Sequence, residues 1–140
     1  MEESPGIYEM DVIDAVCSYL RSRGYNIRRR VKKVTDKGND IEAIAPDCTE
    51  LYIEAKGSTS SRKGSARYGK EFNNNQKTDH VAKAVFKALS YVSGKKLGGI
   101  ALPDDHEHRE IVKEVELALK QVGIRVFFVD PVGKKRVREF

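Results

Sequence analysis

Three charged residues near the middle of the chain are spaced so that they could bind a metal and act on a phosphate. Asp40 opens the segment 40–45, and Glu54 and Lys56 close the segment 51–56. Both segments alternate polar with apolar residues, which is typical of strands with one buried face. The residues between the segments include proline and aspartate, which favour a turn. The sequence therefore predicts a hairpin of two strands that carries all three charges.

Strand alternation decides which of these side chains share a face. Glu54 and Lys56 point to one side of their strand, and Ile53 and Ala55 point to the other. A pairing that places Asp40 on the face of Glu54 brings two carboxylates and an ammonium together. Carboxylates a few ångströms apart raise each other's pKa unless a cation lies between them. The alternative is an ordinary amphipathic hairpin with a solvated salt bridge across it.

A hard divalent cation such as Mg²⁺ suits this group of side chains. It takes oxygen ligands and is held by one or two carboxylates together with water and substrate phosphates. A lysine beside the metal can orient the attacking water or stabilise the charge that builds on a phosphate. The residue types therefore indicate metal-assisted hydrolysis of a phosphate ester.

Asp40 followed by Glu54-x-Lys56 resembles the PD-(D/E)XK motif of the restriction-endonuclease-like nucleases. The surrounding pattern is similar to Mrr-type restriction enzymes and to archaeal Holliday-junction resolvases. It consists of a helix that ends in Arg-Gly-Tyr, a basic strand, the two strands of the hairpin, a polar loop, and a helix opened by a glutamine. The likeness covers residues 8–102, and Asn39 stands where the motif has proline.

The resemblance implies an active site. Asp40 and Glu54 would hold Mg²⁺, with the backbone carbonyl of Ala55 as a further ligand. Lys56 would position or activate the water and offset the developing charge. The resemblance thus implies activity with Mg²⁺, for which Mn²⁺ substitutes.

Two more site residues come from the helices on either side of the hairpin. In the family, an acid on the first helix often reaches the metal, and both Glu9 and Asp14 are candidates. We assign Glu9, because it lies one turn before Ile13 on the buried side of the helix. On the second helix, Gln76 and His80 resemble the Gln-x-x-x-Tyr pattern of the RecB-like branch of this superfamily, with histidine in place of tyrosine. Gln76 would hold a water or a phosphate near the metal.

Basic residues gather in the strand before the hairpin and in the loop after it. A charge run often marks only a solvated face, and a loop of small residues is often only an insertion. The position beside the proposed site favours contacts with phosphates. The predicted nucleic-acid-binding residues are Arg28, Arg30 and Lys32 in the strand, and Arg62, Lys63, Arg67 and Lys70 in the loop.

Composition fits one globular domain over residues 1–140. Charged residues make up 34% of the chain, and the net charge of +5 favours a polyanionic partner. No apolar run is long enough to span a bilayer, and the N-terminus does not resemble a signal peptide. The spacing of Cys17 and Cys48 suits neither a zinc site nor a disulfide framework. We therefore expect a cytoplasmic protein that does not enter a membrane.

The pattern of elements predicts an α/β domain in the order α-β-β-β-α-β-α-β, with a central mixed sheet flanked by helices on both faces. The resemblance implies the restriction-endonuclease-like form of this fold. The expected helices are 8–23, 75–92 and 106–122, and the expected strands are 25–35, 40–45, 51–56, 98–102 and 124–129. Asp104 and Asp105 are expected to cap the third helix rather than to bind a metal.

The function that follows is a metal-dependent endonuclease that hydrolyses phosphodiester bonds in DNA. One alternative is a nuclease-like module that binds nucleic acid without cutting it, or a subunit of a larger restriction or repair assembly. A further alternative is an interaction domain whose charge serves solubility. The resemblance also makes a homodimer the expected state, with the apolar strand 124–129 as a candidate edge for pairing.

Overall fold

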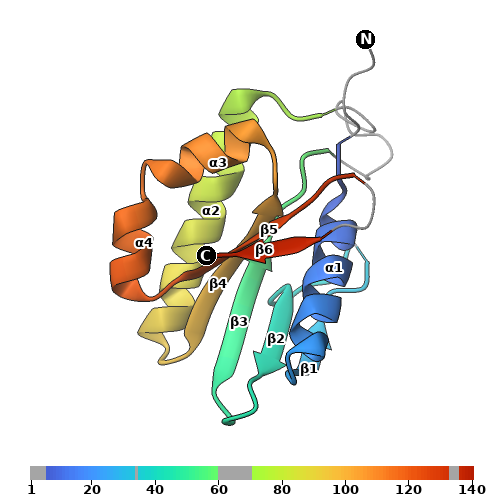
Figure 1. Cartoon of the computed structure of the whole chain (residues 1–140), viewed down its shortest axis with the longest axis vertical. Helices are drawn as coiled ribbons and strands as arrows, with labels where there is room; N and C mark the ends of the chain where they lie inside the picture. The colour runs from blue at the N-terminus through green and yellow to red at the C-terminus, as the bar shows by residue number, and fades with distance from the viewer. Residues whose placement is uncertain (1–5, 34, 60–70, 133–135) are drawn as a thin grey trace.

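A computed structural model describes residues 6–33, 35–59, 71–132 and 136–140 of the chain (Figure 1). It confirms the predicted α/β fold, with a six-stranded mixed sheet between helices. The elements are α1 (Glu9–Ser22), β1 (Asn26–Arg30), β2 (Ile41–Ile44), β3 (Glu50–Ala55), α2 (Asn74–Ser93), β4 (Leu97–Pro103), α3 (His106–Lys113), α4 (Glu116–Val122), β5 (Arg125–Val129) and β6 (Val137–Glu139). No helix in the described ranges is both long enough and apolar enough to cross a membrane.

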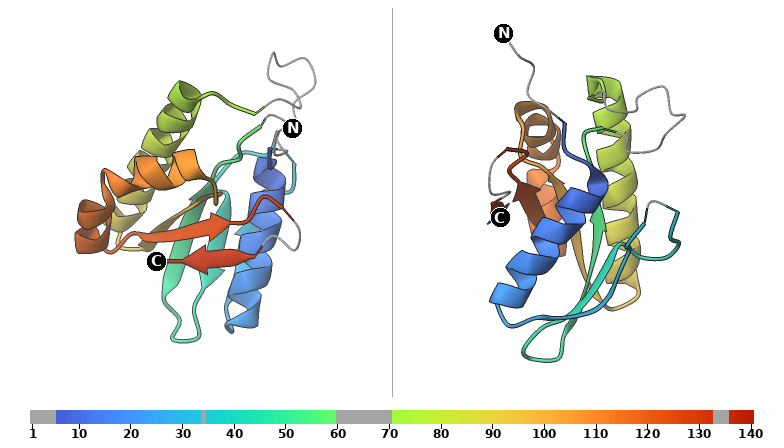
Figure 2. Two further views of the ribbon diagram at one scale, coloured as in Figure 1. Left: turned by 45° about the horizontal axis from the view of Figure 1, so that its top comes forward. Right: turned by 90° about the vertical axis from the view of Figure 1, so that its right-hand side faces the viewer.

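The strands lie in the sheet in the same order as in the chain, from β1 to β6. The first three strands pair antiparallel, β3, β4 and β5 run parallel, and β6 returns antiparallel to β5. Helix α1 covers one face of the sheet, and α2, α3 and α4 cover the other (Figure 2). Parallel strands need a crossover, and α2 supplies it between β3 and β4. The carboxyl end of β3 is thereby placed between α1 and α2.

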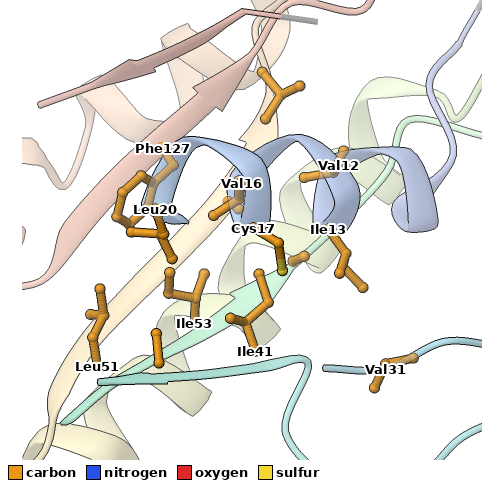
Figure 3. Close-up of a cluster of buried hydrophobic side chains, with 14 of the residues drawn as sticks. Val12, Ile13, Val16, Cys17, Leu20, Val31, Ile41, Leu51, Ile53 and Phe127 are labelled. Atoms are coloured by element: carbon orange, nitrogen blue, oxygen red, sulfur yellow. The ribbon is translucent and has the colours of Figure 1, made fainter. Parts of the chain in front are cut away.

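Helix α1 is fixed to the sheet by one apolar stripe. Val12, Ile13, Val16, Cys17 and Leu20 recur at helical spacing and are all buried. They pack against side chains of β2, β3 and β5 (Figure 3). Each fully buried aliphatic side chain contributes about 1.5 to 3 kcal/mol. This packing fixes where the first turn of α1 lies relative to the hairpin.

Helix α2 packs on the opposite face through a second cluster that includes Val81, Ala84 and Ala88. Small residues allow the helix and the sheet to approach closely. At Gly98 in β4, a Cβ atom would lie 2.6 Å from the backbone oxygen of Ala88. This close contact sets the distance of α2 from β3 and β4.

Replacing Gly98 with alanine should therefore destabilise the fold. The backbone oxygen of Ala88 cannot move away without shifting α2, so we expect a loss of about 1 to 3 kcal/mol of unfolding free energy. Urea unfolding followed by circular dichroism measures this loss. Gly94→Ala is the matched control, because its added Cβ would lie 3.4 Å from the nearest atom, the backbone oxygen of Tyr91. A Gly98→Ala protein as stable as Gly94→Ala would contradict the prediction.

Three expected elements differ from the structure. Strand β1 ends at Arg30 rather than at residue 35, because the Asp36 carboxylate accepts hydrogen bonds from the N–H groups of Lys32 and Lys33 and forms a turn. The expected helix 106–122 is divided into α3 and α4. The helix is interrupted at Val115, whose N–H bonds to the oxygen of Val112, three residues earlier instead of four. Val115 also has a non-helical φ of −121°.

The third difference concerns the edge of the sheet. The strand at 124–129 corresponds to β5, which lies between β4 and β6 and is not an edge. The end of the chain, for which no strand was expected, forms β6, whose Val137 pairs with Val129. The edges of the described sheet are therefore β1 and β6, and the predicted dimer edge was wrong.

Candidate active site

The hairpin places Asp40 opposite Glu54. Strands β2 and β3 pair antiparallel with Ile41 opposite Ile53, and continuing this register by one residue brings Asp40 to Glu54. Asp40 is buried, and its Oδ2 accepts a hydrogen bond of 2.8 Å from the N–H of Ala55. The two carboxylates thus share a face of the sheet, as strand alternation allowed.

The segment that leads into α1 is joined to the residues that follow β3. The N–H of Ser58 donates to the oxygen of Ile7 over 2.8 Å, and the N–H of Ile7 donates to Ser58 Oγ over 2.9 Å. A Cβ at Gly57 would lie only 2.5 Å from the backbone nitrogen of Glu9. Glu9 is therefore held beside the end of β3, close to Lys56, the first residue after the strand.

Asp14, the other acid considered on this helix, lies elsewhere. Its side chain is 60% exposed and forms an ion pair of 2.6 Å with Arg30. Glu9 lies close enough to Lys56 and Glu54 for their charges to affect its pKa. Of the two acids, Glu9 is the one that the structure brings to the hairpin.

Burial and mutual repulsion raise the pKa values of two carboxylates of the site. Burial raises the pKa of Asp40 to about 7, and the charges of Glu54 and Glu9 add to this rise, while the N–H of Ala55 and the charge of Lys56 oppose it. Burial also raises the pKa of Glu9, which Lys56 lowers and Glu54 raises. Within the described ranges, the charges of Asp40, Glu54 and Glu9 are thus opposed by the ammonium of Lys56, and an additional cation would offset their repulsion further.

Tyr91 of α2 positions Glu54. Its hydroxyl lies 3.1 Å from Glu54 Oε1 and 3.2 Å from Asn39 Oδ1, so its single hydrogen can be donated to either oxygen. The ring packs edge-on against Tyr52 at 5.5 Å between centroids. Burial and then the charge of Glu54 raise the pKa of Tyr91, which keeps the hydroxyl protonated as a donor. The sequence did not reveal this role, because Tyr91 lies among the apolar residues of α2.

Gln76 caps the helix in which it lies. Its Oε1 accepts a hydrogen bond from the N–H of Asn73, and its own N–H donates to Asn73 Oδ1, which forms a capping box. The side-chain oxygen is thus engaged at the start of α2. A catalytic role for Gln76 stays a prediction.

His80, one turn further along α2, lies near Lys56. Its ring contacts Phe72 edge-on at 4.6 Å. Burial and then the charge of Lys56 lower the pKa of His80, and both effects favour the neutral imidazole. Its Nδ1 is buried and has no hydrogen-bond partner within the described ranges.

The basic residues of the first strand are partly engaged with acids. Arg28 bonds to Glu50 over 2.6 Å and to Glu42 over 3.0 Å, and it also donates to the hydroxyl of Tyr52. Arg30 pairs with Asp14, as described above, whereas Lys32 is exposed. Their contacts with phosphate stay predictions. Arg62, Lys63, Arg67 and Lys70 lie outside the described residues.

A second group of acids lies where α2 and α3 begin. Glu71, Asp105 and Glu107 offer oxygens within 4.8 Å of one another, a spacing that could hold a metal ion. The buried ammonium of Lys77 lies among them, 3.5 Å from Asp105 and 3.7 Å from Glu107. A metal would have to displace this ammonium. Asp105 also caps α3, as expected, by accepting from the N–H of His108.

An open pocket of about 510 Å³ lies beside the site. Glu54 and Lys56 form one side of it, and Gly38, from the segment between β1 and β2, borders it as well. Helix α2 supplies the remaining wall, which consists of Ala82, Lys83, Phe86 and Lys87. The pocket gives a ligand access to Glu54 and Lys56.

Comparison with known proteins identifies no family. No family model matches the chain, and no curated protein matches it. Among solved structures, the fold is similar to SfsA of Pyrococcus furiosus in complex with Ca²⁺, with a TM-score of 0.38 and 16% sequence identity. The match covers 93% of this chain and 58% of that chain, so this chain spans less than two thirds of SfsA. A likeness this low assigns neither a family nor an activity.

Proposed function

We propose that this chain is a metal-dependent endonuclease of the PD-(D/E)XK type that hydrolyses phosphodiester bonds in DNA. The observation that carries the proposal is the position of the buried Asp40 opposite Glu54, with Lys56 and Glu9 at the same end of β3. These residues come from three separate segments of the chain. A solvated salt bridge on a surface hairpin needs neither the burial of Asp40 nor the nearby acid of α1.

The side chains of this site have the donor chemistry that a hard divalent cation takes. All three acids offer carboxylate oxygens, which suit Mg²⁺ and Mn²⁺. Burial and the neighbouring acids raise the pKa values of Asp40 and Glu9, and a bound cation would offset both effects. Asp40, Glu54 and Glu9 would hold the ion, and the resemblance adds the carbonyl of Ala55. The bound ion would supply Lewis-acid polarisation of the phosphate and a more acidic water.

The chain's own residues would orient the two carboxylates, hold the attacking water and stabilise the developing charge. The N–H of Ala55 fixes the orientation of the Asp40 carboxylate, and the hydroxyl of Tyr91 fixes that of Glu54. Lys56 is half-buried at the wall of the pocket, where its ammonium can hold the attacking water by a hydrogen bond. The same ammonium stabilises the negative charge that grows on the phosphate oxygens as the bond breaks.

Cleavage of a panel of labelled DNA tests the proposal. The panel contains linear duplex, single strand, flap and four-way junction, each with Mg²⁺, Mn²⁺ or EDTA. We expect cutting with either metal and none with EDTA. If no substrate is cut and DNA binding is tight and insensitive to EDTA, the chain is a binding module or a subunit of a larger assembly, and the proposal is wrong.

Removing the hydroxyl of Tyr91 should weaken metal binding. Tyr91→Phe leaves the ring packing intact but removes the donor to Glu54, and loss of such an outer contact typically lowers metal affinity 10- to 100-fold. Calorimetric titration with Mn²⁺ measures the change. Tyr52→Phe is the matched control, because its ring packs against Tyr91 while its hydroxyl bonds to Arg28. Equal Mn²⁺ affinity in the two variants would refute the positioning role.

A further inference from the structure

We propose that the pocket beside the site binds a DNA strand with an unpaired base, which stacks on Phe86 while Lys83 and Lys87 hold the adjoining phosphates. This inference rests on the proposed function, since it takes Glu54 and Lys56 as the residues at the bond that is cut. It adds the class of substrate, a strand that is single or locally unpaired. Neither lysine nor Phe86 was among the residues predicted to bind nucleic acid.

The geometry of α2 places these residues together. Ala82, Lys83, Phe86 and Lys87 recur at the spacing of one helical turn, so they form one stripe along α2. This stripe forms the wall opposite Glu54 and Lys56, and the segment between β1 and β2 lies alongside it (Figure 2, right). A strand lying along the stripe would therefore pass directly over the site.

The charge of the pocket favours a polyanion. Among the described residues, its charged lining consists of Lys56, Lys83, Lys87 and one acid, Glu54. Within the described ranges, neither Lys83 nor Lys87 has a carboxylate within ion-pair distance. The ammonium of Lys87 lies 5.9 Å from the centre of the Tyr91 ring. Arg28 is paired with Glu42 and Glu50, whereas the charges of these two lysines can neutralise phosphates. Lysines one turn apart suit successive phosphates of one strand.

Phe86 distinguishes a strand with unpaired bases from a closed duplex. Its side chain is 75% exposed, although large aromatic residues usually bury their rings. An exposed ring between lysines is the arrangement by which proteins bind single strands, because every base offers a flat face for stacking. Inside a duplex both faces of a base are already stacked, so only an unpaired base can reach Phe86.

Binding measurements with metal chelated test the inference separately from cleavage. Fluorescence anisotropy compares a labelled single strand, a duplex with a single-stranded overhang and a blunt duplex of the same sequence, all in EDTA. Phe86→Ala should weaken binding of the first two about tenfold and leave the blunt duplex nearly unchanged. Phe86→Tyr should bind as wild type does. Leu117→Ala is the matched control, because Leu117 is 71% exposed on α4, away from the pocket.

The lysines are tested through the salt dependence of binding. Replacing both Lys83 and Lys87 with alanine should make the slope of log K against log salt for the single strand shallower by about 1.4, or about 0.7 for each lost phosphate contact. Lys113→Ala, whose side chain is 72% exposed on α3, should leave the slope unchanged. An unchanged slope in the double variant overturns the inference.

The outcomes separate this inference from the proposed function. Binding that depends on Phe86, without cleavage of any substrate, would support the inference and refute the nuclease. Metal-dependent cleavage with unchanged binding by Phe86→Ala, or an equal loss for the blunt duplex, would support the nuclease and overturn the inference. In that case Phe86 would serve a different partner, such as another protein.

Discussion

Lys56→Ala should cleave DNA at least about a hundredfold more slowly than the wild type, the scale observed when one charge-stabilising group is removed from an active site. The charge of this ammonium lowers the pKa values of Asp40 and Glu9, so it lies close to both carboxylates. Without it, the attacking water loses its hydrogen-bond donor and the developing phosphate charge is not offset. The rate of single-turnover cleavage with Mg²⁺ measures the effect.

Two further variants test whether the loss of activity comes from the charge of Lys56. Lys56→Met retains an apolar stem that can pack as lysine does, and it should lose as much activity as Lys56→Ala. Lys113→Ala removes an exposed lysine on α3 and should cut at the rate of the wild type. Circular dichroism establishes that each variant is folded. If a folded Lys56→Ala protein cuts as fast as the wild type, the mechanism proposed for Lys56 is wrong.

Asp40→Asn should stabilise the metal-free protein at neutral and alkaline pH. Because the pKa of Asp40 rises from 3.8 to about 7 on folding, the native state binds more protons than the unfolded state between these values. The wild type should therefore lose stability as the pH rises from about 4 to about 7, by on the order of a few kcal/mol. Asparagine cannot ionise, and its side-chain oxygen can still accept from the N–H of Ala55. The variant should thus lack this pH dependence.

Urea unfolding in EDTA at acidic and alkaline pH measures the difference. Mg²⁺ should restore stability to the wild type at alkaline pH and should do so much less for Asp40→Asn, because the variant has lost a ligand. Asp47→Asn is the control, since hydrogen bonds from Thr49 lower the pKa of this exposed acid instead of raising it. A wild-type protein whose stability does not fall between about pH 4 and about pH 7 would show that the acids at the hairpin are not crowded.

The sequence was sufficient to propose which residues lie at the centre of the candidate site. Alternation along the strand predicted that Glu54 and Lys56 share a face, because side chains in a strand have a period of two residues, and the pairing of β2 with β3 then adds Asp40 to that face. The position of Glu9 on the buried side of α1 followed from helical periodicity. Both inferences depend on local geometry, which the order of residues determines directly.

The remaining features depend on packing between distant segments. Tyr91 reaches Glu54 only because Gly98 allows α2 to approach the sheet, and no local pattern in the helix indicates this contact. Gln76 shows that a local pattern can have two explanations. The glutamine that suggested a catalytic role also forms the capping box at the start of α2. The position of β5 inside the sheet likewise depends on a distant segment, because β5 is covered on one side by β6.

The close approach at Gly57 has a consequence for how relatives of this chain can diverge. Any side chain at this position would push the first turn of α1 away from β3 and would take Glu9 with it. The two positions should therefore change together. Relatives that keep glycine directly after the Glu-x-Lys sequence should keep an acid at the start of the first helix. Relatives with a larger residue there should be free to vary at the position of Glu9, and an alignment of such relatives would show this covariation.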